Sequence, residues 1–72
     1  MKLKKRLEMI QDENNCILDN QLRIHYILNH IVYDELKPRE IFVLGEFLLE
    51  LLENIKTNSE GIENILRGLL KN

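Results

Sequence analysis

The chain contains no tryptophan, one proline, one cysteine and three glycines in 72 residues. A single thiol, Cys16, cannot form an internal disulfide and cannot build a zinc site without several further ligands. A lone cysteine fits a reducing, cytoplasmic location, and we expect its small side chain to be buried or half-buried. The scarcity of glycine and proline permits long, uninterrupted helices.

Long apolar runs and an excess of one charge are also missing. The most apolar stretch, residues 41–52, contains Glu46 and Glu50 and is much shorter than the roughly 20 residues that a membrane span needs. The basic start, residues 2–6, is soon followed by Glu8, so we expect no export signal. The net charge of −2 gives no global attraction for nucleic acids.

No motif for catalysis or cofactor binding is visible. His25 and His30 are five residues apart and point about 140° away from each other on a helix, so they cannot hold one metal together. His30 and Asp34 have the spacing of a hydrogen-bonded pair on one helix. We find neither a glycine-rich phosphate loop nor a nucleophile with its base, and we predict no enzyme activity, no metal and no cofactor.

An apolar residue returns every seven positions through the first half of the chain. This row consists of Leu3, Ile10, Ile17, Ile24 and Ile31. Four residues after its first four members comes a second row, Leu7, Asn14, Gln21 and Leu28. Alternating steps of four and three are typical of a long helix that packs against another helix.

The second half repeats this heptad pattern beyond Pro38. Its two rows are Ile41, Leu48, Ile55, Ile62 and Leu69, and Gly45, Leu52, Ser59 and Leu66. If the chain reverses at Pro38, the rows meet at residue numbers that sum to 72 or 73, such as Ile17 with Ile55, and the polar residues Asn14 and Ser59 also meet. The pattern predicts an all-α fold, an antiparallel helical hairpin with a heptad seam, in a single domain over 1–72.

We expect a helix over about 2–34, a turn at 35–37 and a second helix from Pro38, which suits the first helical position. Thr57 to Gly61 are poor helix formers with a Thr-x-x-Glu spacing that can start a new helix. The second helix therefore either ends near 56 and a third short helix covers 60–71, the break falling near Asn58, or it continues to 71.

The apolar arc of the second helix is wider than one partner helix covers. A chain of this length also buries little surface as a monomer. We therefore expect two hairpins to dimerise into a four-helix bundle. The predicted dimer or partner interface consists of Phe42, Phe47, Leu49, Leu51, Leu22 and Ile27.

Polar residues interrupt the predicted seam at Asn14, Gln21 and Ser59. A buried polar residue in a coiled coil fixes register and oligomeric state at some cost in stability, and we interpret these three residues in this way. The alternative is a hinge or a groove that admits a polar group of a partner.

The hairpin would also bring basic residues from both ends of the chain to one tip. These residues are Lys2, Lys4, Lys5, Arg6, Arg67 and Lys71, of which the last five are candidates for binding anions. We predict a small, non-enzymatic regulatory or adaptor protein that binds itself and another protein and no membrane. Its abundance of Asn, Ile, Lys and Leu is typical of AT-rich bacteria or their mobile elements. The alternatives are a nucleic-acid-binding regulator that uses this tip, and a structural or scaffolding oligomer.

Overall fold

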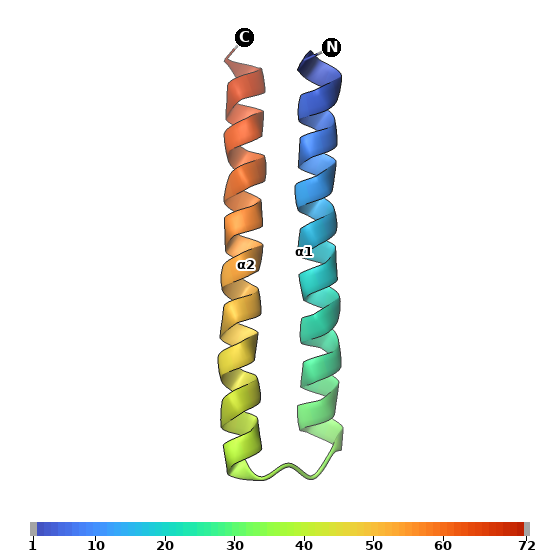
Figure 1. Ribbon diagram of the computed structural model, residues 1–72, viewed down its shortest axis with the longest axis vertical. Coiled ribbons are helices and arrows are strands. Elements are labelled where there is room, and N and C mark those ends of the chain that lie inside the picture. Colours follow the sequence, from blue (N-terminus) through green and yellow to red (C-terminus); the bar gives the residue numbers. More distant parts are fainter. Residues whose placement is uncertain (1, 72) are drawn as a thin grey trace.

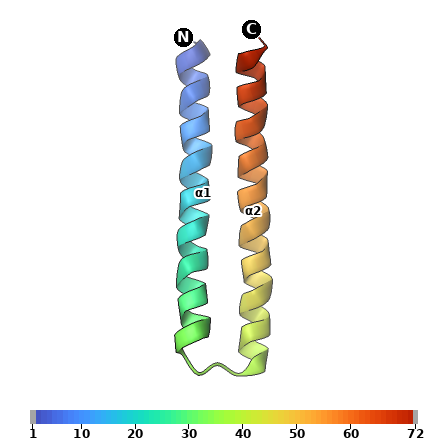
Figure 2. The ribbon, with the colours of Figure 1, turned by 180° about the vertical axis from the view of Figure 1, so that it is seen from behind.

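The computed structural model describes residues 2–71, with the side chains of residues 3–71. Two helices, α1 (Lys2–Tyr33) and α2 (Pro38–Leu70), account for nearly all of this part of the chain. They run antiparallel and side by side, so that both termini lie at the same end (Figure 1), and the same arrangement is seen from behind (Figure 2). The predicted all-α helical hairpin is confirmed.

A short connection, residues 34–37, reverses the chain. α1 ends with a hydrogen bond from the Asp34 N–H to the His30 carbonyl oxygen at 3.1 Å. Lys37 has the extended conformation (φ −73°, ψ 151°) that a residue before proline prefers, and its carbonyl oxygen accepts the N–H of Glu40 at 2.9 Å. Pro38 begins α2, where its missing N–H leaves no helical hydrogen bond unmade.

The inner face of each helix contains only one of the two rows that the sequence predicts. Ile10, Ile17, Ile24 and Ile31 on α1, and Leu48, Ile55, Ile62 and Leu69 on α2, are half-buried as expected. The first member of each predicted row, Leu3 and Ile41, is exposed instead. The rows Leu7, Asn14, Gln21, Leu28 and Leu52, Ser59, Leu66 are exposed. In their place the inner face contains Arg6, Glu13, Asn20 and Ile27 on α1, and Leu44, Leu51, Asn58 and Ile65 on α2.

This difference is the same on both helices, and it corrects the predicted seam. The second inner row follows the first by three residues rather than four, so it lies about 100° around the helix from its predicted place and the centre of the buried face shifts by about 50°. On α2 the reason is side-chain size, because Leu44, Leu51 and Ile65 offer more apolar surface than Gly45 and Ser59. The buried face of α1 is displaced in the same way, so that the buried faces of the two helices meet.

The register of the two helices follows from one contact between them. Asn58 Nδ2 donates a hydrogen bond to Glu13 Oε2 at 2.8 Å, which places residue numbers that sum to 71 opposite each other. In this register Ile17 and Ile55 lie at the same level of the hairpin. The predicted polar contact between Asn14 and Ser59 is wrong for the hairpin interior, because both residues are exposed.

α2 continues through Thr57 to Gly61 without a break. The Thr57 hydroxyl donates a hydrogen bond to the Glu53 carbonyl oxygen at 3.1 Å, a local bond that helix interiors tolerate. Of the two alternatives for this segment, the structure has the continuous helix, and the described residues form no third helix.

Candidate functional site

The hairpin has two broad faces of different character, which the positions of the inner rows define. Met9 and Gly68 each precede an inner-row residue, and they line one shallow groove together. Residues one position before Ile10, Ile17, Ile62 or Leu69 therefore lie on one broad face, the groove face. Residues four positions after a member of this first inner row lie about 50° to its other side, and residues one position after such a member lie about 100° to that side. Both kinds of residue, from both helices, share the opposite face.

This opposite face is rich in leucine, and we call it the leucine face. Large apolar side chains on it are exposed over 43% of their surface or more. They are Leu7, Leu18, Leu28, Val32, Phe42, Leu49, Leu52, Leu66 and Leu70. Gly45, Asn14, Gln21 and Ser59 lie among them, in the rows that contain Leu7, Leu28, Leu52 and Leu66.

Four of the six predicted interface residues are exposed and two are not. Phe42 and Leu49 belong to the leucine face, at 65% and 67% exposed, Phe47 lies on the groove face, and Leu22 is exposed on the outer side of α1. Leu51 is predicted to lie on the outside, but it is 2% exposed and is the only buried residue among residues 3–71. It occupies the second inner row of α2, which the sequence interpretation assigned to Leu52.

Ile27 is also placed differently from the prediction. It is half-buried in the second inner row of α1, so the hairpin itself uses most of its side chain. The rotation of the buried face that exposes Leu28 is the cause.

The interior has a polar layer that the sequence interpretation missed. Glu13 and Asn58 are both half-buried and bonded to each other. A Cβ atom added to Gly61 would lie 3.2 Å from the Glu13 carboxyl carbon, so the absence of a side chain at Gly61 gives this carboxylate its space. The sequence does contain a sign of this polar layer. One heptad row of α2 has a single polar member, Asn58, among the apolar residues Leu44, Leu51 and Ile65.

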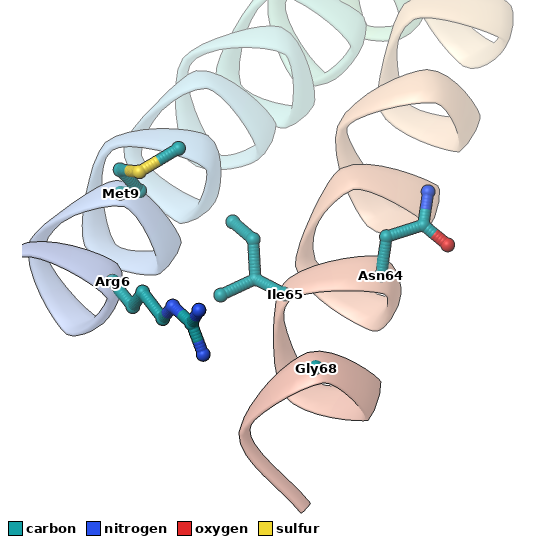
Figure 3. Close-up of a pocket in the computed structure, with 5 residues that line it drawn as sticks. All are labelled: Arg6, Met9, Asn64, Ile65 and Gly68. Atoms are coloured by element: carbon teal, nitrogen blue, oxygen red, sulfur yellow. The ribbon is translucent and has the colours of Figure 1, made fainter. Parts of the chain in front are cut away.

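A shallow groove of about 330 Å³ lies between the helices near the tip, on the groove face (Figure 3). Ile65 points from α2 toward α1, and Arg6 extends from α1 into the space between the helices. Met9, Asn64 and Gly68 complete the lining. The groove is open to solvent, and Gly68 lines it without a side chain.

The basic residues gather at the tip as predicted from the hairpin. Lys4, Lys5, Arg67 and Lys71 are exposed and Arg6 is half-buried, whereas the side chain of Lys2 lies outside the described residues. Arg67 is engaged by Glu63, whose Oε1 accepts the guanidinium Nε–H at 3.1 Å. The basic side chains of the tip that a ligand could contact therefore lie mainly on α1.

The histidines and the cysteine are separate surface groups. His30 Nδ1 is bonded to Asp34 Oδ2, as their spacing predicts, and His25 Nε2 lies 3.2 Å from Asn29 Nδ2. Cys16 is exposed, not buried or half-buried as expected, because it lies about 100° around α1 from the inner residue Ile17.

The described part of the chain has neither a cluster of metal ligands nor a membrane-spanning helix. Residues 2–71 bring together no group of three or more His, Cys, Asp or Glu side chains that could hold a metal ion. Within the same residues, neither helix has a stretch long and apolar enough to cross a membrane.

Comparison with known proteins provides no relative. No family model, curated protein or solved structure matches the chain.

Proposed function

We propose that this chain is a small, non-enzymatic protein-interaction module whose leucine face packs against a second copy to form a four-helix bundle. The observation that carries the proposal is the amount of surface left uncovered. The hairpin exposes 6098 Å², whereas a compact monomer of its mass exposes roughly 4,700 Å². Its radius of gyration is 16.5 Å, against about 11 Å for a compact domain of this length.

The hairpin as a whole leaves uncovered the area that an interface needs. The excess of roughly 1,400 Å² per chain is larger than the roughly 800 Å² that each partner buries in an interface of standard size. On α2 the second inner row is largely apolar and has further exposed leucines beside it, a pattern typical of bundles rather than of isolated pairs. A second copy of the chain presents an apolar face of equal length and is present wherever the first one is.

Two single substitutions on α1 test which face associates. Leu28 on the leucine face and Met9 on the groove face have nearly equal exposure, 46% and 48%. Leu28→Glu is expected to leave a single folded chain in sedimentation equilibrium, because a bundle would have to bury the new charge. Met9→Glu, the matched control, is expected to keep the dimer. Dissociation by Met9→Glu with a stable Leu28→Glu dimer would refute the use of the leucine face.

We propose that the dimer acts as a regulator or adaptor by binding a different protein on its groove face. Dimerisation through the leucine face leaves Phe47 and the groove beside Met9 uncovered, and exposed aromatic and methionine side chains are good anchors for protein partners. Affinity capture from host lysate is expected to recover one stoichiometric protein with the wild-type dimer and with Leu22→Glu, and to lose it with Phe47→Glu. Equal recovery with all three would contradict a role for this face.

The basic tip supports a second candidate function, nucleic-acid binding. Exposed Lys4 and Lys5 lie next to Arg6 at the end of α1, where they could contact phosphate groups. Binding of this kind would appear in a gel shift at low salt, weaken steeply with added salt and disappear when these three residues are changed to Glu. No shift at low salt eliminates this candidate. A third candidate, a scaffolding oligomer, requires a mass above that of a dimer.

A further inference from the structure

We infer that the second copy lies tip-to-turn on the leucine face, so that the basic tip of each hairpin meets the turn end of the other. This inference rests on the proposed dimer and adds its orientation. Two hairpins that share one face can be related by a two-fold axis along the helices or across them. In the first arrangement, tip-to-tip, α1 packs on α2 of the second copy. In the second, tip-to-turn, α1 packs on α1 and α2 on α2.

The exposed rows of the leucine face form four layers. From tip to turn these layers contain Leu7 with Leu66, Asn14 with Ser59, Gln21 with Leu52, and Leu28 with Gly45. The tip-to-tip arrangement stacks each layer on its own copy. It creates one layer of four leucines and one of two leucines and two glycines, which leaves a void or forces the bundle to splay.

The tip-to-turn arrangement distributes the same side chains evenly. The layer of Leu7 and Leu66 meets the layer of Leu28 and Gly45, so both outer layers of the bundle contain three leucines and one glycine. Leu66 then packs over Gly45 of the second copy, where no Cβ atom obstructs it. Along the edges, Leu18 meets its own copy and Phe42 meets Leu70 of the second copy.

Polar groups in the interface also pair better tip-to-turn. Asn14 faces Gln21 of the second copy, and two such amide pairs form by symmetry, each able to donate and to accept a hydrogen bond. Tip-to-tip packing instead sets the long Gln21 side chain against Leu52. Tip-to-turn packing sets Ser59 against Leu52, and the serine hydroxyl can bond to a carbonyl oxygen of its own helix. The residues predicted to fix register would do so between hairpins rather than within one. Lys56 meets its own copy at the rim, where solvent screens the two charges.

The charges along the hairpin favour the same orientation. Residues 3–9 and 63–71 at the tip carry five basic and two acidic side chains. Residues 30–44 at the turn end carry two basic and three acidic side chains. Tip-to-tip packing therefore brings two positive ends together, whereas tip-to-turn packing places each against a slightly negative end.

Cross-linking with a bismaleimide of short span tests the orientation, because Cys16 is the only native thiol. In a Cys16→Ser background, Leu18→Cys is expected to give covalent dimers at least about tenfold faster than His25→Cys, since the dimer holds only the first pair of thiols close together. Both residues lie in the same exposed row of α1, one heptad apart. The wild-type chain is expected to react as slowly as His25→Cys, because Cys16 lies toward the groove face.

Each other outcome overturns a defined part of the inference. A slow Leu18→Cys homodimer with a fast mixed product between Leu18→Cys and Lys56→Cys chains would establish tip-to-tip packing and leave the proposed dimer intact. Fast cross-linking of wild-type Cys16 would place the interface on the groove face. Slow reaction of all variants, with the sedimentation mass of a single chain, would reject the dimer itself.

Discussion

Glu13 and Asn58 form a hydrogen-bonded polar layer in an otherwise largely apolar interior, and Gly61 makes room for it. A half-buried carboxylate is costly without a partner, and the Asn58 amide supplies one. A polar layer of this kind disfavours any sliding of the helices, because a shift would separate the carboxylate from its donor. The two residues thus fix the register within the hairpin.

Changing Gly61→Ala tests this layer. Alanine in a helix interior gains about 1 kcal/mol over glycine, but here the new Cβ displaces the Glu13 carboxylate and its hydrogen bond, which is worth a similar amount. We expect nearly unchanged stability in urea denaturation at fixed protein concentration, and the full gain when Glu13 is also alanine. Gly68→Ala, where a Cβ meets no heavy atom within 4 Å, is the control. An equal gain from Gly61→Ala and Gly68→Ala would show that Glu13 is not held in place.

Leu51 carries more of the hairpin's internal packing than any other described residue. Leu51→Ala should cost about 2–5 kcal/mol, as leucine truncations in cores do, and abolish cooperative unfolding or lower its midpoint sharply in circular dichroism. Leu22→Ala makes the same change at an exposed position and should alter stability by less than about 0.5 kcal/mol. Equal effects of the two substitutions would contradict the observed rotation of α2.

The helices themselves follow closely from the sequence. The heptad rows and Pro38 predict two long helices, the turn and the antiparallel order, because each depends on local periodicity and local backbone chemistry. The face that each helix buries was only half predictable. Glu13 and Asn20 make the true second row of α1 look polar, whereas Leu7 and Leu28 make its neighbour look like a seam. Only the pairing with α2, where Leu44 and Leu51 are inward, decides between them.

The start of α2 is a weak point that one substitution should strengthen. Lys37 occupies the N-cap position with no side-chain hydrogen bond to the helix. Lys37→Asp would accept an N–H bond of the first turn and place a negative charge at the positive end of the helix dipole, worth about 1 kcal/mol.

Thermal unfolding measures this gain, and we expect a midpoint higher by about 4–8 °C for each kcal/mol in a domain of this size. Lys56→Asp makes the same change of charge inside α2 and should not raise the midpoint, because aspartate is unfavourable in helix interiors. A rise for both variants would indicate a general charge effect instead of capping.

The whole hairpin is long and thin, 53 Å by 14 Å by 12 Å across its Cα atoms. Two helices of this length bury one stripe of each other and leave the leucine face in water, which the sequence already indicates by an apolar arc wider than one partner covers. The sequence could not say which apolar residues remain outside, because that depends on the rotation of both helices together. With the rotation known, Phe42, Leu49 and Leu52 are on the outside and Leu51 and Ile27 are not.

Self-association is the central claim, and sedimentation equilibrium of the wild-type chain over a wide concentration range tests it most directly. We predict a reversible transition from one chain to twice its mass, with helix content and thermal midpoint rising as dimers form. A single-chain mass at all concentrations, together with cooperative unfolding and full helix content, would contradict it, and so would assemblies larger than a dimer.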